Sequence, residues 1–231
     1  MRPRSAILIA AALLFVVSHY VPFGDVALYP LTLFTTWVHE MGHGLTALIV
    51  GGHFDSLDIY RNAGGLAHAY AARGWPDALV AAGGLLAPPI LGSAILAIVH
   101  GPRRSRILLG ALAVALVASM VIWVRTPVGL AAMTVVALAL GWAAWKLDWD
   151  HRVIVSQVLG VVLALDTVTR MVGYAFMKEV ELNGKTTPSD VGIIAMNLGG
   201  SHLWYGLAIT VIALGLLSLG GWWAWRRPGR S

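Results

Sequence analysis

The chain has 231 residues, of which 58% are hydrophobic and 12% are charged, whereas a soluble domain carries about 25% charged residues. This composition predicts a single membrane-embedded domain over residues 1–231, an all-α polytopic fold of six or seven transmembrane helices. Cysteine is absent, which excludes disulfides, a cysteine nucleophile and thiolate ligands, so a metal must be held by His, Asp or Glu. The net charge is +5, and many of the arginines lie in short loops and near the termini, where membrane proteins contact lipid head groups. We therefore expect contact with the lipid bilayer and no nucleic acid partner.

The first apolar run covers residues 5–21 and follows Arg2 and Arg4, a pattern that is also typical of a signal peptide. No small residue pair suited to cleavage follows the run, which ends in bulky side chains. We therefore expect a retained first helix. The second run, residues 31–50, stops at Gly51 and Gly52, which is a signal for the end of a helix.

Inside the second run lies the sequence His39-Glu40-Met41-Gly42-His43, an HExxH motif. On a helix its two imidazoles lie one turn apart on the same face, where they can bind one Zn²⁺, and Glu40 can act on water at the metal. Residues 31–50 carry no other ionisable side chain. Hydrocarbon penalises ionisable groups, so the motif indicates a functional site. A chance motif on a water-facing helix fits less well, because this helix has no obvious polar face.

Residues 53–60 roughly alternate polar and apolar side chains, residues 62–65 contain a turn signal, and residues 66–70 fit a returning strand. We expect a small β-hairpin directly after the HExxH helix, with an ordinary polar loop as the alternative. An exposed edge of such a hairpin is suited to bind a substrate segment by strand addition.

The next apolar run, residues 77–100, contains Gly83-Gly84 and Pro88-Pro89, which allow close packing or a broken helix. Four more apolar runs are expected to form helices, at residues 107–124, 128–145, 153–176 and 203–225. Residues 177–201 form the longest connection between runs and are polar at their start.

Three segments together resemble the site-2 protease family, the M50 metallopeptidases, and most closely its compact M50B-like branch. They are the HExxH motif, the segment Gly64-Gly65-Leu66-Ala67-His68, and residues 82–88 with their glycines and proline. The resemblance implies an intramembrane zinc protease in which Glu40 is the catalytic base and His39 and His43 are ligands. Gly64, Gly65 and His68 are expected to contribute to substrate binding, and the alternative for His68 is a place among the groups that support the metal ligands.

The family's third zinc ligand is an Asp on a later transmembrane helix, in a Leu-Asp-Gly motif. The nearest match is Leu165-Asp166-Thr167, which lacks the glycine. A carboxylate within the run 153–176 is costly without a partner, so Asp166 is the expected ligand. Arg170, one turn later, offers an ion pair instead. Asp190 is the rival ligand, although its place before an apolar segment also suits a helix N-cap.

These observations predict a zinc metalloendopeptidase that hydrolyses a peptide bond in or near a transmembrane segment of a membrane protein substrate. Its expected location is the bacterial cytoplasmic membrane. Two other classes stay open: a non-proteolytic metal-binding scaffold, and a metal transporter. A transporter requires polar groups on several helices, whereas the predicted spans contain few beyond HExxH, Asp166 and Arg170.

Overall fold

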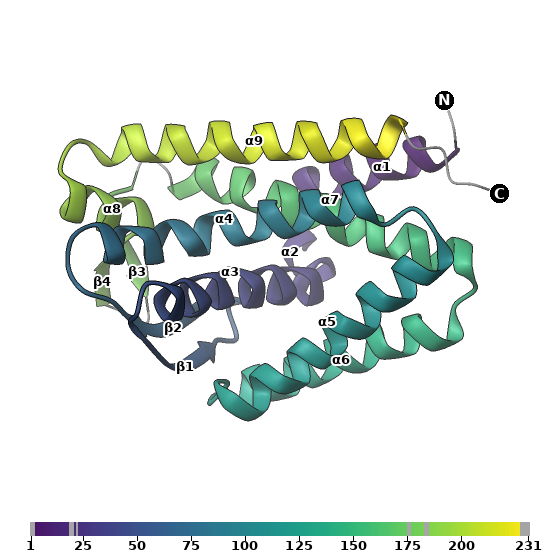
Figure 1. Cartoon of the computed structure of the whole chain (residues 1–231), viewed down its shortest axis with the longest axis horizontal. Helices are drawn as coiled ribbons and strands as arrows, with labels where there is room; N and C mark the ends of the chain where they lie inside the picture. Colours follow the sequence, from purple (N-terminus) through teal and green to yellow (C-terminus); the bar gives the residue numbers. More distant parts are fainter. Residues whose placement is uncertain (1–2, 19–20, 22, 175–176, 183–184, 227–231) are drawn as a thin grey trace.

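The computed structural model describes the chain except for residues 1–2, 19–20, 22, 175–176, 183–184 and 227–231. The described residues form helices and two short hairpins (Figure 1). The helices are α1 (Pro3–Ser18), α2 (Gly24–Ala27), α3 (Tyr29–Ile49), α4 (Trp75–Ile98), α5 (Pro102–Ile122), α6 (Pro127–Lys146), α7 (Trp149–Tyr174), α8 (Asp190–Leu198) and α9 (His202–Arg226). The strands are β1 (His53–Ile59), β2 (Gly65–Tyr70), β3 (Glu179–Leu182) and β4 (Lys185–Pro188).

Among the described residues, 5 helices are long and apolar enough to cross a bilayer, namely α4, α5, α6, α7 and α9. The apolar part of α1 is shorter, and α3 has 21 residues but contains the polar HExxH segment. The predicted polytopic all-α membrane fold with a small hairpin after the HExxH helix is confirmed. The chain is an integral membrane protein.

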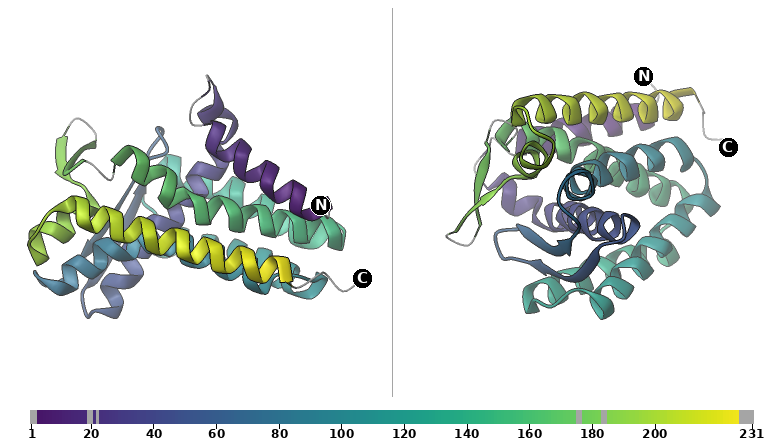
Figure 2. Two further views of the ribbon diagram at one scale, coloured as in Figure 1. Left: turned by 90° about the horizontal axis from the view of Figure 1, so that it is seen from above. Right: turned by 60° about the vertical axis from the view of Figure 1, so that its left-hand side comes forward.

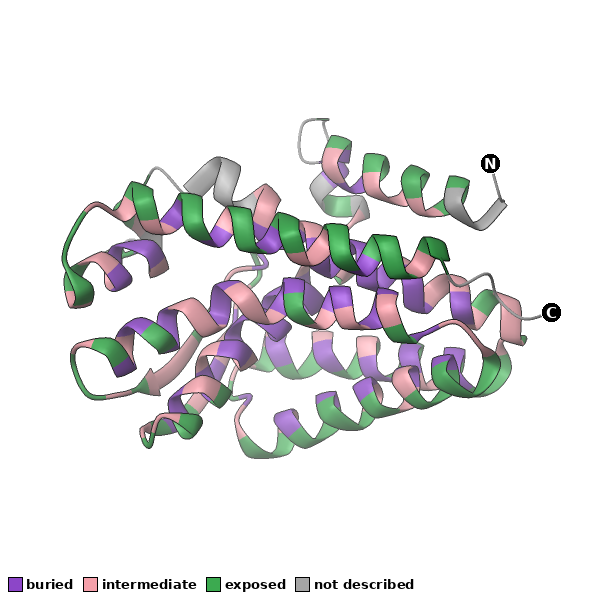
Figure 3. Cartoon of the chain, turned by 45° about the horizontal axis from the view of Figure 1, so that its top comes forward, coloured by how far each residue is buried: buried purple, intermediate pink, exposed green. Residues whose placement is uncertain are grey.

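Helix α4 is the centre of the arrangement, because it packs against α3, α7, α8 and α9. In Figure 1 it lies between α9 and α3, while both hairpins and α8 gather at one end of the helices. The α5–α6 pair lies on the side opposite α9, as the right-hand view of Figure 2 shows. Exposed residues run along the outward face of α9, and buried residues face the neighbouring helices (Figure 3).

The glycines and prolines of α4 produce close packing without a break in the helix. A Cβ added to Gly42 of α3 would lie 2.5 Å from the carbonyl oxygen of Gly83, so these two backbones touch. Pro89 has no N–H, and therefore the carbonyl of Leu85 loses its partner within the helix. The Thr167 hydroxyl of α7 donates to that carbonyl at 2.7 Å. Packing between helices thus replaces the hydrogen bond that proline removes.

The β1–β2 hairpin forms as predicted, with antiparallel pairs such as Leu57 with Ala67 and a register shift between Phe54 and Ser56. The loop between α5 and α6 covers the outer edge of β1: the N–H of Leu57 donates to the carbonyl of Trp123 at 2.9 Å, and the N–H of Arg125 donates to the carbonyl of Leu57 at 3.1 Å. Both strands contact α3, and on the outer edge of β2 the N–H of Ala67 donates to Glu40 of that helix. The hairpin therefore presents its β2 edge toward the HExxH helix.

The long connection 177–201 contains more structure than the sequence indicated, which was only an apolar segment after Asp190. It forms β3, β4 and the nine-residue helix α8. Val191 and Ile194 of α8 are buried with Ala78 and Leu85 of α4 and Ile209 of α9. Through this packing, part of the predicted connection belongs to the membrane domain. Asp190, the first residue of α8, is thereby brought to α3.

Candidate metal centre

The HExxH segment lies on the covered part of α3, between α4 and the β1–β2 hairpin. His39 and Glu40 are only 9% and 6% exposed, and the rings of His39 and His43 meet edge to face with centroids 4.7 Å apart. This is the one-turn spacing that the sequence predicts for residues i and i+4. Burial between helices removes both imidazoles from lipid.

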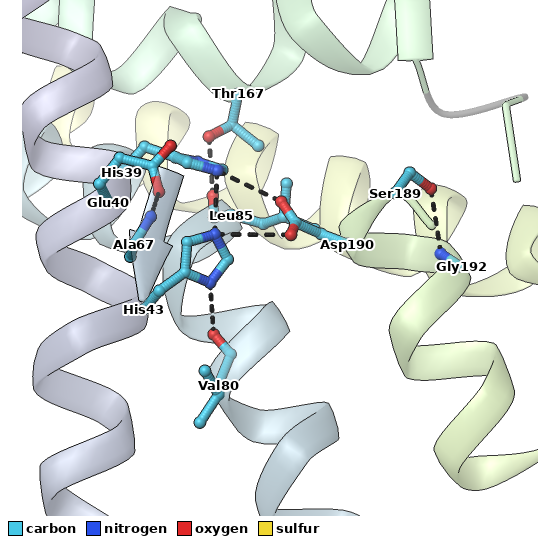
Figure 4. A network of polar contacts seen from close by, with 10 residues as sticks. All are labelled: His39, Glu40, His43, Ala67, Val80, Leu85, Thr167, Ser189, Asp190 and Gly192. Atoms are coloured by element: carbon cyan, nitrogen blue, oxygen red, sulfur yellow. Dashed lines mark hydrogen bonds and ion pairs between the residues drawn. The ribbon is translucent and has the colours of Figure 1, made fainter. Parts of the chain in front are cut away.

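Three ligand atoms converge there: Nε2 of His39, Nε2 of His43 and the carboxylate of Asp190 (Figure 4). The two nitrogens are 3.1 Å apart, Asp190 Oδ2 lies 3.2 Å from His39 Nε2, and Asp190 Oδ1 lies 3.4 Å from His43 Nε2. Tetrahedral zinc, with bonds of about 2.0–2.2 Å, places its ligand atoms roughly 3.3–3.6 Å apart. The spacing of the two nitrogens and the carboxylate therefore suits one tetrahedral ion, and two nitrogens with one carboxylate oxygen are a ligand set that zinc accepts.

The imidazole of His43 is held in the orientation that a metal ligand needs. Its Nδ1 lies 2.9 Å from the carbonyl oxygen of Val80 in α4, which can only accept a hydrogen bond. The proton therefore sits on Nδ1, and Nε2 keeps its lone pair for a metal. Gly84, one turn further along α4, leaves the space for this ring, since a Cβ there would overlap His43 Cε1 and Nε2.

Asp190 reaches the histidines because it is the first residue of α8. The N-cap of this helix is Ser189, whose hydroxyl accepts from the N–H of Gly192 at 3.1 Å. The possible capping role of Asp190 is thus filled by its neighbour. Its carboxylate points toward the two histidines of α3, as Figure 4 shows.

Asp166, the carboxylate favoured from the sequence, is not in the group formed by the two histidines and Asp190. It lies in α7 and is 3% exposed. The structure thus groups Asp190, and not the expected Asp166, with the two histidines. The physical reason is that α7 faces α4 at Leu85, through the hydrogen bond from Thr167, whereas α8 approaches the histidines directly. The side chain of Arg170, its proposed ion-pair partner, falls outside the described side chains.

Glu40 points toward the hairpin. Its Oε2 accepts a hydrogen bond from the N–H of Ala67 in β2 at 2.8 Å. A Cβ added to Gly65 would lie 2.6 Å from Glu40 Cγ and 2.8 Å from its Oε1, so only glycine fits beside this carboxylate. The Thr36 hydroxyl donates to the carbonyl of Ala63 at 2.8 Å and ties the turn to α3. The hairpin and α3 therefore fix the position of Glu40 together.

The three predicted substrate-binding residues take different places. Gly65 contacts Glu40, whereas Gly64 lies in the turn, where its N–H donates to Asn62 Oδ1 at 3.0 Å. His68 Nε2 lies 3.1 Å from Asp58 Oδ2 on the neighbouring strand and does not belong to the group of three ligand atoms. Only Gly65 is thus brought to the site directly.

The sequence also gave no sign of the contacts that orient the site through backbone atoms, namely the carbonyl of Val80 and the N–H of Ala67. Any residue type supplies these atoms, so no side-chain pattern marks them. Asp190 did carry a signal, as the acidic residue at the start of an apolar segment.

The model of the Peptidase M50B-like family aligns with residues 6–220 of the chain. Searches of curated proteins and of solved structures gave no match.

Proposed function

This chain belongs to the Peptidase M50B-like family, a membrane metallopeptidase family, and we propose that it is a zinc endopeptidase of the site-2 protease kind. Its substrate is a membrane protein, cut at a peptide bond in or near a transmembrane segment. The observation that supports this most is the convergence of His39, His43 and Asp190, with the buried Glu40 directly after His39 in α3. We place the protein in the bacterial cytoplasmic membrane.

Zinc bound by His39, His43 and Asp190 would polarise the scissile carbonyl and activate water at its open position. The proton transfers of the reaction are carried out by a side chain of the protein. Glu40 would accept the proton of the attacking water and pass it to the leaving amine, as a general base and then a general acid. The N–H of Ala67 holds Oε2, which leaves Oε1 as the oxygen that exchanges protons.

The β2 edge is suited to hold an unwound substrate. Leu57 and Ile59 direct their N–H groups away from β2, to the α5–α6 loop and to Thr126. Alternation along an antiparallel pair means that Ala67 and Gly65, which lie opposite, direct their backbone groups away from β1. The N–H of Ala67 is already donated to Glu40, so a substrate strand would pair with the remaining outward backbone groups of this edge, beside Glu40. Strand addition also satisfies the peptide groups that a substrate helix exposes when it unwinds.

The exchange Glu40→Gln tests the proposal, because it keeps the shape of the side chain and removes the base. The purified variant should retain about one zinc per chain, since Glu40 is not a ligand. Its cleavage rate should fall by about 10²–10⁴-fold, the usual contribution of a general base. Glu179→Gln is the matched control, because Glu179 is an exposed residue of β3.

Mass spectrometry of the purified variants measures their zinc content. Quantitative proteomics of membrane fractions measures the loss of cleavage in cells. We expect a membrane protein to accumulate in cells with Glu40→Gln and not in cells with Glu179→Gln. Equal membrane proteomes would favour the non-proteolytic scaffold. A protein that binds no zinc, or that keeps its zinc after His39 and His43 are both changed to Ala, would reject the metal site.

A further inference from the structure

We propose that Asn197 is a positioning residue that holds the third ligand, Asp190, in place; the ligand role of Asp190 rests on the function proposed above. Asn197 lies at the far end of α8, about 10 Å from Asp190 along a helix that rises about 1.5 Å per residue. It makes three hydrogen bonds. Its Nδ2 donates to Asp77 Oδ2 at 2.7 Å and to the carbonyl of Ile193 at 3.0 Å, and its Oδ1 accepts from the N–H of Gly74 at 2.8 Å.

Helix α8 needs such a tie. Nine residues do not form a stable helix alone, so its position depends on tertiary contacts. Val191 and Ile194 supply apolar contacts, which resist separation but do not fix rotation or sliding. Gly199 and Gly200 follow directly, both with positive φ, so the chain after α8 is not a rigid support. Ser189 joins the start of α8 to the carbonyls of Met177 and Lys178, and the directional hydrogen bonds of Asn197 join its far end to α4.

The partner of Asn197 is the same segment of α4 that orients His43. Asp77 lies one turn before Val80, whose carbonyl holds His43 Nδ1. The first turns of α4 therefore fix one ligand directly and a second through Asn197 and α8. The separation between Asp190 and His43 is set by this single segment.

Asparagine suits this place because the site asks for a donor and an acceptor together. Gly74 is the N-cap of α4, with φ 94° and no side chain to satisfy a backbone donor, and its own N–H is satisfied by Asn197. The carboxylate of Asp77 accepts only. Aspartate at 197 would repel it, and leucine would leave both Gly74 and Asp77 without these partners.

Zinc affinity, measured by chelator competition, tests the role of Asn197. Changing outer partners of metal ligands typically weakens metal binding by about 10–100-fold, and we expect this for Asn197→Leu and Asn197→Asp. The double exchange Asp77→Asn with Asn197→Asp restores a donor opposite an acceptor and should recover most of the affinity. A loss of zinc affinity that came from other damage by the exchanges, and not from the missing hydrogen bond between positions 77 and 197, would not be repaired in this way.

Tyr205→Phe is the control. It removes a hydrogen bond to the carbonyl of Gly199, at the same end of α8, without touching Gly74 or Asp77. Its zinc affinity should stay within about twofold of the original protein. Unchanged affinity in Asn197→Leu, or no recovery in the double exchange, would overturn the proposal.

A second measurement does not depend on zinc. The chain has no cysteine, so spin labels can be placed at Leu79→Cys and Leu198→Cys, both on exposed positions of α4 and α8. In the metal-free protein we expect a narrow distance distribution that broadens with Asn197→Leu. An unchanged distance distribution in Asn197→Leu would show that Asn197 does not hold α8 against α4. If the protein bound no zinc, the proposed function would fail while this result still decided whether Asn197 holds α8.

Discussion

The α3–α4–α8 region and the α5–α6 pair use similar apolar helices for different ends. In the most apolar window of α5, 28% of the residues are buried, against 56% in α4. The α5–α6 pair shows apolar side chains such as Val114 and Val121 to the outside and buries only hydroxyls such as Ser119 as polar groups. The first region buries His39 and Glu40. Ionisable groups thus lie where helices cover them on several sides, because lipid cannot solvate them.

Glycine shows the same contrast. Gly42, Gly83 and Gly84 have neighbours that a Cβ would strike, whereas Gly110 in α5 has nothing within 4 Å. In the first region the missing side chain is what lets α3, α4 and the ligands approach. In α5, Gly110 does not permit a close approach of this kind, because no neighbouring atom lies near the position of its missing side chain.

The largest expected effect separates the two candidate carboxylates. Asp190→Ala removes a ligand and should weaken zinc binding by at least about 100-fold, beyond the roughly 10–100-fold cost of changing an outer partner. Asp166→Ala should cost less than about tenfold. Metal titration of both purified variants measures this, and the reverse order would return the ligand role to Asp166.

Next is a comparison of two adjacent glycines. Gly65→Ala places a methyl group against Glu40 and should displace the carboxylate, which costs about 100-fold in rate for a shift of about 1 Å. Gly64→Ala meets only Asn62 Oδ1 at 3.1 Å and should keep nearly full activity. Cleavage assays on a substrate found by proteomics test this, with zinc content unchanged in both variants. Equal rates would show that the hairpin does not position Glu40.

The third prediction tests the contrast between glycines in the two regions. Gly84→Ala should destabilise the protein by about 1–3 kcal/mol, the usual cost of overpacking, and weaken zinc binding through His43. Gly110→Ala should instead stabilise α5 by about 0.5–1 kcal/mol, because alanine loses less backbone entropy. Denaturant unfolding in detergent distinguishes the two. A change in the free energy of unfolding with the same sign for both variants would contradict the contrast between the two regions.

The smallest effect concerns an exposed pair beyond α6. The N–H of His151 donates to the Asp148 carboxylate at 3.0 Å, and this bond, together with the contact to the His151 imidazole, lowers the pKa of Asp148 below its ordinary value. A lowered pKa gives stability that is present above the ordinary value of about 4 and is lost as the pH falls through the folded value.

Asp148→Ala should therefore lower the melting temperature at pH 7, by no more than about 2–4 °C. The difference from the original protein should shrink as the pH falls below about 4. Asp55→Ala, an exposed residue of β1, is the control. A difference that grew toward acid pH would contradict the assignment.

The sequence by itself determined the membrane class, the helices, the β1–β2 hairpin and the one-turn spacing of His39 and His43. These features depend on residues that are neighbours along the chain: apolar runs, alternation, and the i, i+4 geometry of a helix. The Gly-rich start of β2 was also recognisable, although its contact with Glu40 was not.

Only the tertiary structure decided which carboxylate faces the histidines. Asp166 and Asp190 both precede or interrupt apolar segments, and each is plausible from local sequence alone. The choice depends on the packing of α8 against α4 and α9, through Val191, Ile194 and the hydrogen bonds of Asn197. The contacts with α4 join residues more than a hundred positions apart, so their effect appears only when the helices are assembled.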